Sequence, residues 1–234
     1  KSQPKVISRA AFVTTLDFIK DFHLEGKEPV MGVAEITEKS MEQSTTAQTN
    51  SQEKKCEVLC LGLAAFRDGK LAGYLDGTET EAFNFVTNKA KSAFITVPAG
   101  DGGSVLEIIK SKADVKTSLE DGKIKLEIRI KVLADMNQEI GTLDISKITP
   151  LKEVEQNFNG LLEAEIAEAV KHVQSEFGSD IFGFGVYFHI QHPKQWKEIK
   201  SVWNQIFSRA EVNVTVMSSV TRTGEIKEPF QLED

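Results

Sequence analysis

The chain has four histidines and two cysteines with which it could bind a metal, at His23, His172, His189, His192, Cys56 and Cys60. His189 and His192 are three positions apart, so on a helix they would share a face and could hold a metal together. No carboxylate motif accompanies them, and Pro193 disturbs helical geometry at that point. We therefore expect the histidines to pack or to form hydrogen bonds, and we predict neither a metal nor a cofactor.

Cys56 and Cys60 lie in a segment with the composition of a β-strand. Strand residues at this spacing point to the same face but are about 13 Å apart, too far for a disulfide or a shared metal. We expect both to be free thiols inside a strand, with little reactivity before the protein unfolds.

Three carboxylates that follow this strand region could support hydrolysis: Asp76, Glu79 and Glu81. A glycosidase mechanism needs two of them about 5 to 10 Å apart in a cleft, one with a raised pKa. Thr78 and Glu81 also have the spacing of a capping box, and acidic residues are favourable in the first turn of a helix. We expect this structural role, and a hydrolase acting on peptidoglycan stays the less favoured alternative.

The remaining motifs do not predict catalysis or nucleotide binding. Residues 100–104 are glycine-rich but lack a lysine and a following helix, so we expect a turn between strands. The segment Gly183-Phe184-Gly185 lacks the third glycine of a dinucleotide fingerprint. Trp196 and Trp203 share one helical face, which fits core packing better than a patch that contacts a partner. We predict no catalytic residues.

Composition excludes two classes of protein. The formal net charge of -7 would repel the phosphate backbone of a nucleic acid. The hydrophobic content of 40% is typical of a globular protein, and no apolar run approaches the roughly 18 to 20 residues that cross a bilayer. We expect a soluble α+β protein.

The first part of the chain predicts a helix over residues 8–22, a strand over 28–36 and a hairpin over 56–75. Asp68-Gly69 is the turn signal of that hairpin. The tract over 37–55 is rich in Ser, Thr, Gln and Glu, so we expect an exposed loop. A short helix should follow Asp76-Gly77.

The second part predicts a largely antiparallel sheet from strands at 92–97, 105–119 and 123–133, with one buried face. A long amphipathic helix over 150–177 should cover it and stop at Gly178, and at 1.5 Å per residue it would be about 40 Å long. We expect Asp180 to be the N-cap of the aromatic run 181–190, followed by a helix over 193–207 and a strand over 212–216.

This order of elements lacks the regular alternation of a doubly wound fold. We therefore predict the α+β class, with antiparallel or mixed sheets covered by helices. We expect two units, an α+β unit over residues 1–90 that contains the hairpin, and a larger α+β domain over 91–234.

Two sets of residues resemble a known family. The first is the hairpin Gly62 to Leu75, of sequence GLAAFRDGKLAGYL, with the following Thr78-Glu79-Thr80. The second is Phe177 to Gly185, of sequence FGSDIFGFG, then HPKQWK from His192, then Trp203, the strand 212–216 and Arg222-Thr223-Gly224. Their order and spacing resemble the Ger(x)C family, the GerAC-like C subunits of bacterial spore germinant receptors, over roughly residues 58 to 224.

The resemblance implies a non-catalytic lipoprotein subunit, needed for the response to nutrient germinants. An acylated, palmitate-type cysteine would anchor it to the outer face of the spore inner membrane, beside the A-type and B-type membrane subunits. The lipobox cysteine of that family is absent from this chain, and Cys56 and Cys60 lie too far inside strands to replace it. One alternative stays open, a stand-alone extracytoplasmic module that binds a nutrient between its two units.

Overall fold

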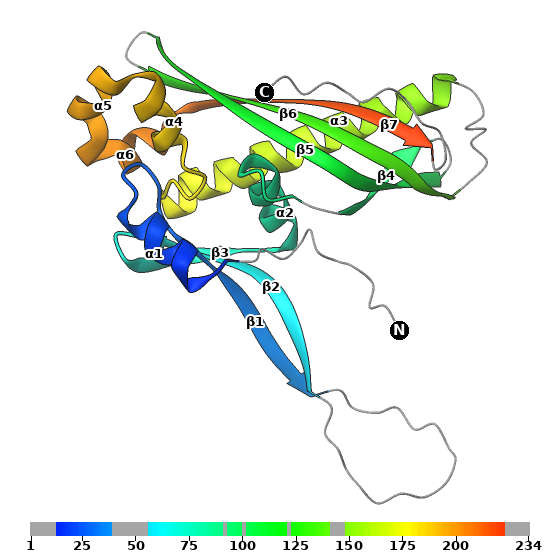
Figure 1. Cartoon of the computed structure of the whole chain (residues 1–234), viewed down its shortest axis with the longest axis horizontal. Coiled ribbons are helices and arrows are strands. Elements are labelled where there is room, and N and C mark those ends of the chain that lie inside the picture. The colour runs from blue at the N-terminus through cyan, green and yellow to red at the C-terminus, as the bar shows by residue number, and fades with distance from the viewer. Residues whose placement is uncertain are drawn as a thin grey trace, which may run out of the picture.

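The computed structural model describes residues 13–38, 56–90, 93–99, 102–120, 123–140 and 148–222. It contains a three-stranded sheet, a four-stranded sheet and helices packed against both, so the predicted α+β class is confirmed (Figure 1). None of the described helices has the length and the hydrophobicity to cross a membrane.

The four-stranded sheet, sheet B, forms the body of the molecule. Its strands lie in the order β4 (Phe94–Ala99), β5 (Gly102–Glu120), β6 (Lys123–Ile140) and β7 (Glu211–Arg222). β4, β5 and β6 pair antiparallel, whereas β7 pairs parallel to β6. The predicted alternation along β6 is confirmed, because one face buries Ile124, Leu126, Ile128, Ile130 and Val132. The sheet is therefore mixed.

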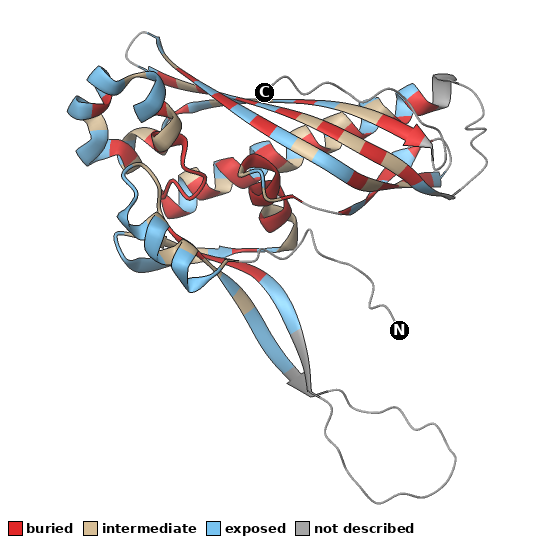
Figure 2. Cartoon of the chain, in the orientation of Figure 1, coloured by how far each residue is buried: buried red, intermediate tan, exposed pale blue. Residues whose placement is uncertain are grey.

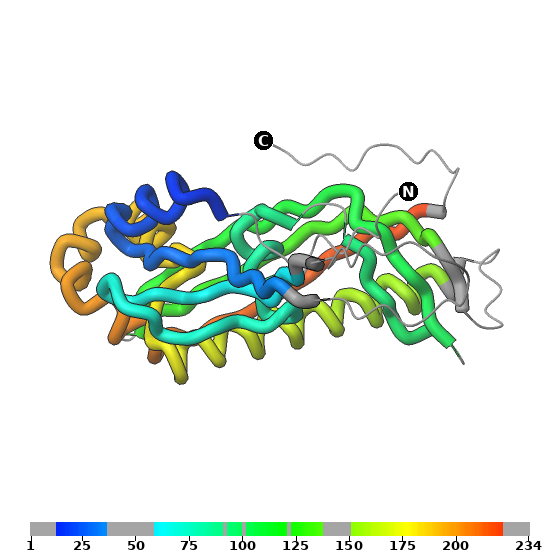
Figure 3. Tube along the Cα trace, turned by 90° about the horizontal axis from the view of Figure 1, so that it is seen from below, coloured from blue at the N-terminus to red at the C-terminus, as the bar shows by residue number. Residues whose placement is uncertain are grey.

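The long helix α3 (Ile148–His172) covers the buried face of sheet B, runs along it (Figure 3) and continues into a π-helical turn over Val173–Phe177. Its buried side includes Val154, Phe158, Leu162, Ile166, Ala169 and Val170. Gly178 ends it in the left-handed region, with a φ of 55°, and its N–H donates to the carbonyl of Val173. The predicted helix and its stop at Gly178 are both present.

The three-stranded sheet, sheet A, consists of β1 (Val30–Glu38), β2 (Cys56–Arg67) and β3 (Lys70–Leu75). The predicted hairpin is confirmed, and its turn has a positive φ at both Asp68 and Gly69. At the base of the sheet, Val30, Leu63 and Leu75 are buried. Beyond the base, β1 and β2 leave the body as an arm whose side chains are largely exposed (Figures 1 and 2).

The helix after the hairpin, α2 (Gly77–Val86), begins two residues earlier than the sequence suggested. Its N-cap is Asp76, which exchanges hydrogen bonds with Glu79 in a capping box, so the prediction of Thr78 and Glu81 as that pair is wrong. Asp76 already supplies the first helical N–H groups with an acceptor, which leaves Thr78 inside the first turn. Glu81 is buried instead of lying at the exposed start.

Helix α1 (Thr15–His23) covers only the second half of the predicted helix at 8–22, and residues before Val13 lie outside the described ranges. Thr14 caps it through a reciprocal pair of hydrogen bonds with Asp17. The apolar stripe of Leu16, Ile19 and Phe22 on this helix is exposed. The ring of Phe18 instead packs edge-on against Phe66 of sheet A, at 5.2 Å.

The predicted helix at 193–207 is broken into α5 (Pro193–Ile199), a 3-10 turn (Lys200–Val202) and α6 (Trp203–Phe207), preceded by α4 (Phe184–Gln191). Trp196 and Trp203 are buried and meet edge-to-face at 5.4 Å, so the core interpretation is confirmed. They pack mainly on each other and on Phe188.

The buried apolar side chains of both sheets belong to one hydrophobic core cluster. The division of the chain near residue 90 stays a prediction. The polar tract predicted as an exposed loop falls largely on residues 39–55, which lie outside the described ranges.

Candidate interaction site at the junction of the two motifs

The two sequence motifs meet where sheet A joins the body. Ser179 donates a hydrogen bond of 2.6 Å from its hydroxyl to the carbonyl of Phe66 on β2. The Arg67 guanidinium reaches the carbonyl of Phe177 at 3.5 Å. A Cβ on Gly73 of β3 would overlap the Phe177 ring, so this glycine admits the ring against the hairpin. The motifs thus hold the hairpin on the body.

Asp180 is the centre of the junction. Its buried carboxylate accepts hydrogen bonds from the backbone N–H groups of Gly183, Phe184 and Gly185 at 2.8 to 3.1 Å. It also accepts one from the Trp203 indole at 2.8 Å. Burial raises the pKa of Asp180 to about 6, although these hydrogen bonds oppose the rise. The carboxylate joins the start of α4 to α6.

The prediction that Asp180 is the N-cap of the aromatic helix needs a correction. The N-cap of α4 is Gly183, with a φ of 82°, and residues 181–183 are not helical. The carboxylate of Asp180 still satisfies the first N–H groups of the helix, from three positions before the cap. Asp180 therefore accepts hydrogen bonds from the helix start, as an N-cap residue would, but it is not the N-cap itself.

The loop between α1 and β1 is also fixed at the junction. Gly26 has a φ of 86°, and a Cβ there would lie 2.6 Å from the backbone of Gly185. The N–H of Glu28 donates to the carbonyl of Asp180 at 2.8 Å, and that of Phe66 donates to Pro29 at 3.1 Å. Glycine at position 26 lets two backbones approach closely, which places the side chain of Glu28.

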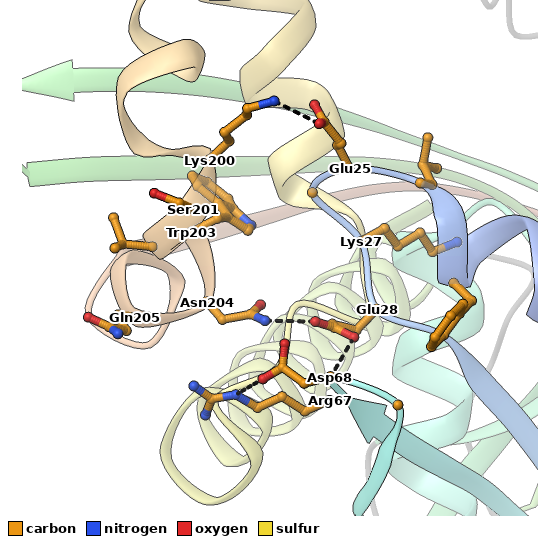
Figure 4. Close-up of a pocket in the computed structure, with 15 residues that line it drawn as sticks. Glu25, Lys27, Glu28, Arg67, Asp68, Lys200, Ser201, Trp203, Asn204 and Gln205 are labelled. Atoms are coloured by element: carbon orange, nitrogen blue, oxygen red, sulfur yellow. Dashed lines mark hydrogen bonds and ion pairs between the residues drawn. The ribbon is translucent and has the colours of Figure 1, made fainter.

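A groove of about 400 Å³ opens beside these contacts (Figure 4). Three segments line it: the end of α1 with the loop after it (residues 22 and 24–28), the β2–β3 turn (67–69), and the 3-10 turn with the start of α6 (200–205). The Lys200 ammonium pairs with Glu25 at 2.8 Å, and the Trp196 indole donates to the same carboxylate at 3.5 Å. Hydrogen bonds from Lys200 and Trp196 hold the pKa of Glu25 below its usual value. The groove is mainly polar and lies between the two predicted units.

The histidines have structural partners. His189 stacks on Trp196 at 5.4 Å, and a ring nitrogen of His192 lies 2.8 Å from the carbonyl of Thr117. His23 contacts the carbonyl of Ile19, and His172 contacts the carboxylate of Glu79. In the described part of the chain, no three His, Cys, Asp or Glu side chains are placed to share a metal ion.

The cysteine expectation is only partly met. Cys60 is a free thiol on β2, as predicted, but it is exposed because the arm leaves the body at this point. An exposed thiol is open to reagents, which corrects the expectation of low reactivity before unfolding. Cys56 belongs to β2, but its side chain lies outside the described set.

The proposed hydrolytic carboxylates are brought together only as a helix cap. The backbone N–H of Asp76 donates to Glu79 and that of Glu79 donates to Asp76, each at 2.9 Å. Both line a second groove of about 790 Å³ along α3, beside His172. Glu81 lies apart from them, in the core. Each of these two carboxylates binds the other's backbone N–H, and that of Glu79 also contacts His172.

Sequence reasoning missed the polar lining of the first groove, above all Glu25, Glu28, Lys200 and Asn204. These residues come from segments that are far apart in the chain and carry no local motif. One local signal was Gly26, which stands between the charged residues Glu25 and Lys27 and could have indicated a close approach of two backbones.

Comparison with known proteins places the motifs in context. A family model described as "Spore germination B3/ GerAC like, C-terminal" matches residues 61–224. Spore germination protein B3 of Bacillus subtilis (strain 168) is 25% identical over 169 residues, which cover 70% of this chain and 44% of that protein. Spore germination protein YndF of the same organism is 21% identical over 160 residues, 68% of this chain and 40% of that protein.

The fold also matches a solved structure. The crystal structure of the GerBC protein superposes with a TM-score of 0.72 at 19% sequence identity, over 94% of this chain and 63% of that chain. The chain spans less than half the length of the two curated relatives that it matches.

Proposed function

The chain belongs to the spore germination B3/GerAC-like family, and from this premise we propose that it acts in the response of a spore to nutrient germinants. In this proposal it is part of a non-catalytic C-type subunit of a germinant receptor. The observation that carries the proposal is the junction, where the motifs that define the family hold a preformed polar groove.

The proposed absence of catalysis draws support from the roles of the reactive side chains. Asp76 and Glu79 cap α2, and His172 contacts Glu79. Asp180, the carboxylate with the raised pKa, is fully enclosed and accepts four hydrogen bonds from protein donors. A general acid must reach a substrate, which an enclosed carboxylate does not.

We further propose that the whole protein is a lipid-anchored subunit on the outer face of the spore inner membrane, where it acts with the A-type and B-type membrane subunits. The support is family membership, because receptor subunits work as an assembly. We also propose that residues 1–90 and 91–234 form two units, since sheet A lies in the first and sheet B in the second.

The direct test is genetic. Deleting the gene should abolish or slow germination triggered by nutrients and leave germination by a non-nutrient trigger intact, since a receptor subunit acts only upstream. A control strain carries the gene back at another locus. Loss of both responses in the deletion strain would contradict the receptor role.

A second candidate is a nutrient-binding module, and the groove between the two predicted units is the observation that favours it. We expect no useful affinity for nutrients in the isolated chain, because the charged groups of the groove mostly pair with one another. A ligand at 100 times its Kd would stabilise the folded state by about 2.7 kcal/mol, a Tm shift of several degrees. A thermal-shift screen of amino acids, sugars and nucleosides should be flat, and a saturable shift of that size would favour the module.

A further inference from the structure

The rim of the first groove carries exposed apolar side chains. Phe22, Leu24 and Val202 line it and are 51%, 44% and 40% exposed. They come from α1, the loop after it and the 3-10 turn before α6, so segments far apart in the chain contribute them. Exposed apolar side chains that gather beside a groove are a common feature of protein-binding surfaces.

The groove is also lined by a carboxylate, that of Glu28, which has no cationic partner among the described residues. Glu28 accepts a hydrogen bond from the Asn204 amide at 2.8 Å and one from the backbone N–H of Asp68 at 3.3 Å (Figure 4). Both donors are neutral. No cation among the described residues forms an ion pair with Glu28. A carboxylate offers about four lone-pair sites, so it retains capacity for a charged donor.

The neighbouring charges are already engaged. Lys200 pairs with Glu25 at 2.8 Å, and Arg67 approaches Asp68 at 3.7 Å. The ammonium of Lys27, next to Glu28 in the chain, pairs with Asp21 at 2.8 Å. Figure 4 shows the side chain of Lys27 directed away from that of Glu28. Of the carboxylates that line the groove, Glu28 is the one left without a neutralising group among the described residues.

The position of Glu28 is set before any partner arrives. Its backbone N–H is hydrogen-bonded to Asp180, and the loop that carries it is held by the close approach of Gly26 and Gly185. Asp68, which donates to its carboxylate, lies in the tight turn between β2 and β3. A site fixed in this way loses little conformational entropy on binding.

We propose that this groove is a docking site for a partner protein that inserts a basic side chain, with its cation at Glu28 and its aliphatic stem against Phe22, Leu24 and Val202. Arginine fits best, because its planar fork can bond both oxygens of a carboxylate while its stem covers apolar surface. The inference rests on the proposed function in one respect, that a receptor subunit needs a surface for its partner.

The test is an NMR titration of the ¹⁵N-labelled chain with Nα-acetyl-arginine N-methylamide, a cation that lacks the free ends of an amino acid. Saturable shifts are expected at the amides of Asp68, Gly69 and Asn204. The matched citrulline derivative is uncharged and should cause none. Glu28→Gln should weaken binding at least about tenfold, since a charged hydrogen bond becomes neutral. Glu198→Gln, an exposed glutamate on α5 outside the groove, is the control and should bind like the parent chain.

Several outcomes would overturn the proposal. These are equal shifts with the citrulline derivative, unchanged binding by Glu28→Gln, or no saturable shift in the parent chain. Shifts at the same amides with free glycine but not with capped arginine would assign the groove to a small zwitterion.

If Glu28→Gln does not fold, Val202→Thr should weaken binding, because it removes apolar surface from the rim of the groove. Unchanged binding by that folded variant would equally contradict the proposal. The titration uses the isolated chain, so its failure is separable from a failed deletion experiment.

Discussion

The edge strands of the two sheets differ in how their backbone polar groups are covered. On the edge strand β7 of sheet B, the N–H groups of Val216 and Val220 donate to Glu163 and Glu155 of α3, each at 2.8 Å. At the opposite edge, Asn157 of α3 donates to the carbonyl of Pro98 on β4. One helix thus satisfies two N–H groups on one edge and one carbonyl on the other, which leaves fewer backbone groups free to pair with another chain.

Among the described residues, no helix covers the arm of sheet A in this way. Within the described ranges β1 pairs only with β2, and Ile36 near its end is 71% exposed. Leu59 and Leu61 on β2 are exposed as well. The edges of sheet B are bonded to α3, whereas the arm of sheet A is exposed. We therefore expect sheet B and α3 to supply most of the stability, and sheet A and the adjoining groove to contact other molecules.

The largest expected contrast is between a junction tryptophan and the arm. Trp196 is 1% exposed, so Trp196→Ala should lower the free energy of unfolding by about 3 to 5 kcal/mol. Ile36→Ala should change it by less than about 0.5 kcal/mol, because Ile36 buries little surface. Urea unfolding followed by circular dichroism measures both. Similar losses for the two variants would remove the division between body and arm.

The second contrast concerns Asp180 and pH. Its pKa is about 6 in the folded protein against an ordinary value of 3.8 for an aspartate, so between these two pH values the folded state holds a proton that the unfolded state has lost. Raising the pH from about 4 to about 6 should therefore lower the free energy of unfolding, by roughly 3 kcal/mol at most. Above about pH 6 this contribution should be constant.

Asp180→Asn tests this contribution. Asparagine cannot titrate, and its amide would face N–H donors, so we expect a loss of roughly 2 to 3 kcal/mol at pH 7. The gap in stability between the parent chain and Asp180→Asn should be widest near pH 4 and narrow towards pH 6. Urea titrations at several pH values measure it. A gap that is constant with pH would show that Asp180 does not titrate in this range.

A smaller effect is expected at the covered edge of sheet B. Glu163→Ala leaves the N–H of Val216 without its acceptor and should cost about 1 kcal/mol. Glu168→Ala, on the exposed side of the same helix, changes helix propensity equally and should cost little. Hydrogen exchange at Val216 should accelerate only in the first variant. Equal exchange in both would mean that the glutamate does not protect the edge.

The smallest effect is chemical. Cys60 is exposed, so in a Cys56→Ser background one thiol should react with a thiol reagent in the folded protein, with almost no change in Tm. A cysteine introduced on the buried face of sheet B would be protected from the reagent until the protein unfolds. If Cys60 reacts only after unfolding, the arm is covered in solution and the contrast between the sheets weakens.

The sequence predicted those elements whose patterns are local. The unbroken alternation along β6, the Asp68-Gly69 turn and the long apolar stripe of α3 each depend on neighbours a few residues apart, and the structure confirms all three. The exposure of the α1 stripe was not predictable in this way. Helical periodicity shows that apolar residues share a face, but the tertiary fold decides whether that face is covered.

The groove escaped prediction for a related reason. Glu28, Asp68 and Asn204 meet through hydrogen bonds between segments that no spacing rule connects. Asp180 was correctly identified as a residue that satisfies a helix start, but its reach past Gly183 needed the bend of residues 181–183. Because glycine adopts many backbone conformations, the sequence alone does not determine which way the chain bends at such a turn.

The parallel pairing of β7 with β6 has a consequence for synthesis on the ribosome. β6 emerges long before β7, since α3 to α6 lie between them in the chain. Until β7 arrives, the nascent sheet exposes the edge of β6 next to the apolar side chains of Ile128 and Ile130. Docking of α3 can cover these side chains, whereas the backbone groups on this edge of β6 stay unpaired until β7 is made, which favours aggregation. A stop codon between α6 and β7 should accordingly give an insoluble product.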